Sequence, residues 1–105
     1  MSVVEVDREQ FWDTVADGQV LVDVWSPDCQ PCVALAPHLE ELPQRYANLT
    51  LAKLDASQAR RLCMQLKIMG LPTLLLFRDG EEVARVSDPK LNAAKVDAWL
   101  DEHLA

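Results

Sequence analysis

One segment of the chain, Val20 to Trp25, constrains its fold more than any other. It reads V-L-V-D-V-W, nearly all apolar and rich in β-branched side chains, with no regular alternation of apolar and polar residues. An unalternated run of this length predicts a central strand that is buried on both faces. Such a strand needs helices above and below it, so we expect an α/β fold.

Strand and helix patterns alternate along the rest of the chain. Further strands are predicted over residues 2–6, 49–54, 73–77 and 82–86, the last two joined by a hairpin turn at Asp79-Gly80. Helices are predicted after an N-cap at Asp7 with its partner Gln10, from Cys29 with a kink at Pro37, over 58–66, and from Asp88-Pro89. The order β-α-β-α-β-α-β-β-α predicts a mixed sheet of about five strands flanked by four helices, in a single domain over 1–105.

The apolar positions of these helices predict the core. They follow a helical period and are expected to face the sheet: Phe11, Trp12, Val15 and Ala16; Leu35, Leu39 and Leu42, with Glu40, Glu41 and Arg45 on the opposite side; Ala59, Leu62, Cys63 and Leu66; Leu91, Val96, Trp99, Leu100 and Leu104.

Composition excludes several classes of function. The chain has 105 residues and a formal charge of -7, which argues against nucleic acid and anionic membrane surfaces as partners. No apolar run is long enough to span a membrane, and we expect no export signal at the N-terminus. Three cysteines, an odd number, argue against a secreted disulfide scaffold.

Two of the cysteines, Cys29 and Cys32, lie where the central strand passes through a turn into a helix. Unpaired N–H groups at a helix start favour a thiolate, which is the reactive form of cysteine. A second cysteine one turn later can bond the first or attack a mixed disulfide formed on it. The intervening Pro31 falls in the first turn, where its missing donor costs nothing. The pair is therefore predicted to cycle between dithiol and disulfide.

A structural zinc site is the alternative interpretation of the pair. Zinc needs four ligands, and the only other candidates are Cys63, His38 and His103. Cys63 completes an apolar helix face and is expected to be a core residue. His38 is expected on the surface. His103 is expected near the C-terminal end of the last helix, where the helix dipole favours a positive charge. We therefore favour redox chemistry, with no metal.

Three segments together resemble the thioredoxin family. They are V-D-V-W-S-P-D-C-Q-P-C with the following Ala36-Pro37, then Lys53-Leu54-Asp55, and M-G-L-P-T-L-L-L-F-R-D-G from Met69 to Gly80. The likeness extends from about Val3 to Leu104 in the right order and spacing, and it implies a thioredoxin fold.

The resemblance assigns roles to the residues of the predicted site. Cys29 would be the attacking thiolate and Cys32 the resolving thiol. Asp23 would exchange a proton with the second cysteine, and its apolar strand should raise the pKa of its carboxyl. Lys53 resembles the lysine that lies near this aspartate in the family. It either pairs with Asp23 or extends into solvent.

The resemblance also implies a surface that binds target proteins. Leu71-Pro72 would form a cis bond beside the cysteines, and the backbone of Leu71 would pair with an extended segment of the target. Met64 would either flank the groove or fill the core. The complete predicted surface consists of Trp25, Asp28, Gln30, Pro31, Met69, Gly70, Leu71 and Pro72.

Three departures from the family concern this surface. Asp28 replaces a tryptophan, Gln30 replaces a glycine, and Ser87-Asp88-Pro89 follows Val86 where the family commonly has a glycine. They affect the choice of partner more than the chemistry. The Asp28 carboxylate opposes the effect of the helix start on the Cys29 thiolate, so we expect a pKa of Cys29 typical of ordinary or mildly activated thiols. A thiol of this kind gains little extra stability in its reduced form, which is typical of a reductant rather than a strong oxidant.

The leading hypothesis is therefore a cytoplasmic protein-disulfide reductase that acts as an electron carrier. It would hold no cofactor and would receive electrons from NADPH or ferredoxin through a separate thioredoxin reductase-type enzyme. Its targets would be disulfide-containing proteins, and we expect a monomer. A disulfide oxidase or isomerase, and a binding scaffold that keeps the fold, are the alternatives.

Overall fold

The segment Val20–Trp25 lies in the centre of the sheet, as predicted. The computed structural model describes residues 2–104 and contains a sheet in the order β1-β3-β2-β4-β5. Strands β1 and β2 run parallel to β3, whereas β4 is antiparallel to both β2 and β5. The predicted mixed sheet is confirmed, with strands at β1 (Val3–Val6), β2 (Gln19–Trp25), β3 (Leu49–Asp55), β4 (Thr73–Arg78) and β5 (Glu81–Ser87).

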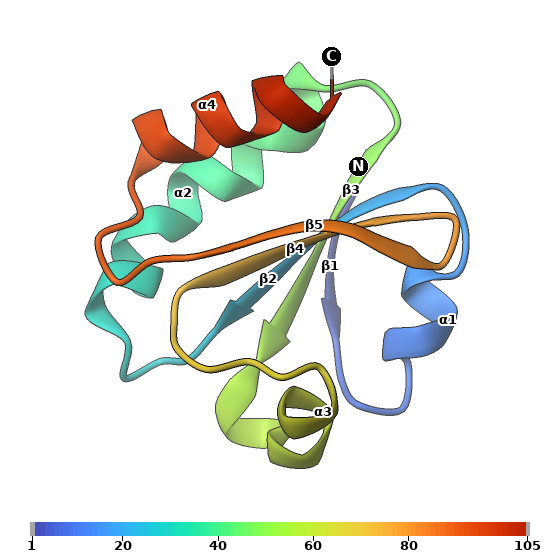
Figure 1. Ribbon diagram of the computed structural model, residues 1–105, viewed down its shortest axis with the longest axis vertical. Coiled ribbons are helices and arrows are strands. Elements are labelled where there is room, and N and C mark those ends of the chain that lie inside the picture. The colour runs from blue at the N-terminus through green and yellow to red at the C-terminus, as the bar shows by residue number, and fades with distance from the viewer. Residues whose placement is uncertain (1, 105) are drawn as a thin grey trace.

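Helices cover both faces of this sheet (Figure 1). Helices α2 (Gln30–Arg45) and α4 (Ala93–Leu104) pack on one face, whereas α1 (Phe11–Val15) and α3 (Arg60–Gln65) lie toward the other. A 3₁₀ turn, η1 (Ala56–Gln58), precedes α3. Alternate residues of a strand point to opposite faces, so each face has its own core cluster. The α2–α4 cluster includes Leu21, Leu35, Leu39, Leu51, Leu74, Val96 and Leu100, and the second includes Phe11, Val22, Leu54, Leu62, Cys63 and Leu75.

The predictions for the first helix need correction. The Asp7 carboxylate accepts hydrogen bonds from the N–H groups of Glu9 and Gln10, but this closes a turn over residues 8–10. Gln10 is the N-cap, without a side-chain bond, and the helix begins at Phe11. Trp12 is 50% exposed because a helix of five residues buries only one face, here Phe11 and Val15.

Two later helices also begin after their predicted starts. The turn η1 displaces the start of α3 from residue 58 to Arg60. The last helix begins at Ala93, because Asn92 rather than Asp88 caps it, accepting a bond from the N–H of Lys95. Leu91 is buried in the loop ahead of that helix. Helix α2 continues through Pro37 and Pro43 as one element.

Arg85 of β5 supports the end of α3 and the loop that follows. Its guanidinium donates to the carbonyls of Leu66, at 2.9 Å, and Lys67, at 3.3 Å, and bonds both carboxylate oxygens of Glu82. The last carbonyls of a helix have no partner within the helix, so this side chain satisfies groups that would otherwise need water. Arg85 thereby ties β5 to the chain that leads toward Pro72.

We expect Arg85→Ala to lower the free energy of unfolding by about 1 kcal/mol, because its charge-assisted bonds are partly exposed to solvent. Urea denaturation of the oxidised protein would measure the change. The matched control is Arg60→Ala, which removes an exposed arginine at the other end of the same helix. Equal effects of the two substitutions would show that the bonds to α3 contribute nothing specific.

Candidate active site

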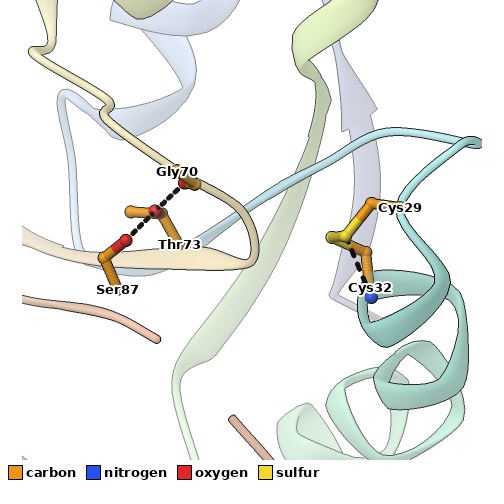
Figure 2. Close-up of a disulfide and its surroundings, with 5 residues drawn as sticks. All are labelled: Cys29, Cys32, Gly70, Thr73 and Ser87. Atoms are coloured by element: carbon orange, nitrogen blue, oxygen red, sulfur yellow. Dashed lines mark hydrogen bonds between the residues drawn. A yellow bond between two sulfur atoms is a disulfide. The ribbon is translucent and has the colours of Figure 1, made fainter. Parts of the chain in front are cut away.

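Cys29 and Cys32 lie at the start of α2 and form a disulfide (Figure 2). Their Cα atoms are 5.2 Å apart. Cys29 is the N-cap residue of the helix, and its Sγ accepts a hydrogen bond of 3.2 Å from the backbone N–H of Cys32. Pro31 occupies the first turn, as expected. The structure thus joins the two cysteines in a disulfide, and the same N–H would stabilise a Cys29 thiolate in the reduced form.

The two cysteines differ in their access to solvent. Cys29 is half-buried, whereas Cys32 is only 3% exposed. The cause is helical periodicity, because Cys32 continues the buried stripe of Leu35 and Leu39 that faces the sheet. An incoming molecule can therefore reach Cys29 more readily than Cys32.

Asp23 lies in β2 on the face that α2 covers, since it alternates with Leu21 of the same core cluster. Its side chain is buried, with the residue 1% exposed, and Oδ2 has no hydrogen-bond partner among residues 2–104. Burial raises the pKa of this carboxyl to about 7, while the Lys53 ammonium lowers it and the Glu40 carboxylate raises it. The carboxyl can therefore take up or release a proton near neutral pH.

Lys53 takes neither of the two positions predicted for it. It is the register partner of Asp23 in β3, but its Nζ donates to Glu40 Oε2 of α2 at 2.6 Å. The same ammonium lies 5.3 Å from the centre of the Trp25 ring, in a cation–π geometry. The structure thus brings Asp23, Trp25 and Lys53 of the sheet together with Glu40 of α2. The helical pattern of the sequence predicts Glu40 on the solvent side of the helix and does not indicate this contact.

The loop before β4 contains a cis bond between Leu71 and Pro72, as the resemblance implied. Pro72 is buried and Leu71 is half-buried. Met69 is 92% exposed, and the neighbouring Gly70 is exposed as well. Met64 is also exposed, so it does not fill the core.

Two hydroxyl groups hold this loop in place. Thr73 Oγ1 forms hydrogen bonds with the carbonyl of Gly70 and with Ser87 Oγ at the end of β5, as Figure 2 shows. Since a hydroxyl has a single proton, Thr73 donates to Gly70 while Ser87 donates to Thr73. The sequence shows that no glycine directly follows Val86, but it does not predict these bonds. Thr73 and Ser87 are 14 residues apart along the chain, and only the pairing of β4 with β5 brings them together.

The remaining predicted site residues lie around the disulfide and differ in exposure. Asp28, Gln30 and Pro31 are exposed, and Trp25 is half-buried at the end of β2. No group of three or more potential metal-ligating side chains occurs within the part of the chain that the structure describes. Among the same residues, no helix is long and apolar enough to cross a membrane.

The candidates for zinc ligands have other roles. Cys63 is buried, as expected, and burial raises the pKa of its thiol. His38 is not a simple surface residue, because its Nε2 lies 2.7 Å from Oδ1 of Asp97 and joins α2 to α4. Because α2 packs against α4, His38 meets Asp97, a contact that the spacing of residues along the sequence does not indicate.

A half-buried cysteine that is bonded to a buried neighbour can exchange with other disulfides, and this places the protein among the thiol–disulfide oxidoreductases. The family model for thioredoxin matches residues 2–102. The chain belongs to the thioredoxin family.

Curated relatives match over almost the whole chain. It is 40% identical to a thioredoxin of Peptoclostridium acidaminophilum, over 97% of this chain and 96% of that protein. It is 38% identical to a thioredoxin of Staphylococcus haemolyticus, over 99% of this chain and all of that protein. A solved thioredoxin structure from Malassezia sympodialis, 23% identical, has a TM-score of 0.85 over 100% of this chain and 96% of its own, which confirms the fold.

Proposed function

We propose that the chain acts as a cytoplasmic protein-disulfide reductase with Cys29 as the nucleophile and Cys32 as the resolving thiol. The observation that supports these roles is the difference in exposure within the disulfide-forming pair at the start of α2. A nucleophile must reach its target, and a resolving thiol needs to reach only its neighbour.

The reaction transfers two electrons in two exchanges. The Cys29 thiolate attacks one sulfur of the target disulfide, forms a mixed disulfide and expels the other target sulfur as a thiolate, which takes a proton. Cys32 then loses its proton and attacks Cys29 Sγ. The mixed disulfide breaks, the second target thiolate leaves and takes a proton, and the Cys29–Cys32 disulfide remains.

Asp23 is proposed to accept the proton of Cys32 in the second exchange. It lies on the face of the sheet that α2 covers, and its pKa of about 7 suits an acid–base group at neutral pH. Lys53 is proposed to act on Asp23 by charge rather than by direct pairing, since its ammonium binds Glu40.

The residues around Cys29 and in the Pro72 loop, exposed except for the half-buried Trp25 and Leu71 and the buried Pro72, are proposed to bind the target: Trp25, Asp28, Gln30, Pro31, Met69, Gly70, Leu71 and Pro72. The backbone of Leu71 would pair with an extended segment of the target, which gives affinity without requiring one sequence. The bonds of Thr73 to Gly70 and Ser87 would keep that backbone in place.

Turnover requires an external electron source. We propose that a thioredoxin reductase-type enzyme restores the dithiol with electrons from NADPH or ferredoxin, that the chain acts as a monomer in a single domain, and that nucleic acid and membranes are not partners. The net charge of -7 supports the last point.

Reduction of insulin by dithiothreitol tests the activity. We expect the wild-type protein at micromolar concentration to shorten the onset of turbidity severalfold, because its dithiol is faster than the small reagent and is regenerated by it. The matched control is protein whose cysteines have been alkylated with iodoacetamide under reducing conditions. A rate equal to that of dithiothreitol alone would contradict the reductase and favour a binding scaffold.

A further inference from the structure

We propose that Glu40 is a positioning residue that holds the Lys53 ammonium away from Asp23, so that the buried carboxyl keeps its proton near neutral pH. This inference deepens the proposed function, since it assigns a control over the proton acceptor of the second exchange. Glu40 does not act on the sulfurs themselves.

The geometry of Lys53 supports this role. Parallel strand pairing places the residue directly opposite Asp23, on the same face of the sheet. From that position an ammonium on a four-carbon side chain would be expected to pair with a carboxylate on the neighbouring strand. It binds the Glu40 carboxylate of α2 instead, at 2.6 Å, and lies over the Trp25 ring.

Because Lys53 binds Glu40, the Asp23 side chain is left without this partner. Its Oδ2 has no hydrogen-bond partner within residues 2–104. The ammonium that acts on it is that of Lys53, which lies on the adjacent strand β3. An unpaired buried carboxylate is costly, so the carboxyl favours its protonated form. If Lys53 turned toward Asp23, the ionised form would gain a partner and the proton would be lost at lower pH.

The surroundings of Asp23 contain few other charges. Lys53 of β3 and Glu40 of α2 are the charged groups that act on it. On the same face, its neighbours in the sheet are Leu21, Trp25 and Leu74, and the buried residues of α4 are Val96 and Leu100. Cys29 and Cys32 of α2 do not titrate while they are joined in the disulfide.

The test is the titration of the Asp23 carboxyl in the oxidised protein, followed by carbon NMR in three proteins. We expect Glu40→Gln to lower the midpoint by about one pH unit, since an opposite charge that gains access to a carboxylate shifts its pKa by about 1–3 units. The matched control, Glu41→Gln, removes the same charge at the next exposed position of α2 and should leave the midpoint nearly unchanged. Equal shifts in the two variants, or no shift in Glu40→Gln, would overturn the proposal.

A second comparison tests whether Glu40 acts by holding Lys53 or by repelling the Asp23 carboxylate with its own charge. In a Lys53→Met background, Glu40→Gln should shift the midpoint much less, because there is no ammonium to release. A full shift in that background would show that Glu40 acts by its own charge and would also overturn the proposal. These titrations do not depend on catalysis, so they remain interpretable if insulin reduction fails.

Discussion

Replacing Cys29 with serine will reduce the rate of insulin reduction to that of dithiothreitol alone, so the whole severalfold acceleration by the wild-type protein is lost. The hydroxyl is a far weaker nucleophile than a thiolate and cannot form a mixed disulfide. The fold should remain, since Cys29 is a half-buried N-cap and serine is also a good N-cap residue. The turbidity assay measures the rate, and circular dichroism checks the fold.

Two further variants make this result specific to the pair. Cys63→Ser removes the remaining cysteine and should retain most of the activity, because that thiol belongs to the core on the opposite face of the sheet. Cys32→Ser should lose turnover but retain the first attack, so it should accumulate mixed disulfides with its targets that reducing agents release. Retention of turnover by Cys29→Ser, or a mixed disulfide on Cys32 of that variant, would reverse the assigned roles.

The parts of the site that depend on local sequence could be predicted. The apolar run of β2 and the cysteines at the next helix start are neighbours along the chain, so their geometry follows from strand and helix rules. The buried state of Asp23 follows in the same way, because a residue in the middle of a central strand is covered on both sides.

The contacts that could not be predicted join elements distant in sequence. Glu40 and Lys53 are 13 residues apart, on a helix and a strand, and helical spacing alone placed Glu40 toward solvent. The bond between Ser87 and Thr73 depends on the register of β4 and β5, and His38 meets Asp97 only because α2 packs on α4. Long polar side chains at the border of a helix face can reach inward, and the pattern of apolar residues does not show which of them do.

Asp23→Asn will make the oxidised protein more stable than the wild type at alkaline pH, and the difference will disappear below about pH 4. The Asp23 pKa is about 7 in the folded protein and near 3.8 when the residue is exposed. Below both values the carboxyl is protonated in both states, so it resembles the amide and the two proteins should match. Between them only the unfolded chain loses the proton, so wild-type stability falls as pH rises. Above pH 7 the full difference is present.

The size of this effect follows from the distance between the two pKa values. A difference of about 3 pH units corresponds to roughly 4 kcal/mol at alkaline pH, a large part of the free energy of unfolding of a small domain. Urea denaturation of both oxidised proteins from pH 4 to pH 9 would measure it, with Asp13→Asn as an exposed control that should show no such trend. A constant difference across this range would mean that Asp23 is ionised in the fold and paired with Lys53. Because folding and proton exchange depend on the same carboxyl, that outcome would also remove Asp23 as the acceptor of the Cys32 proton.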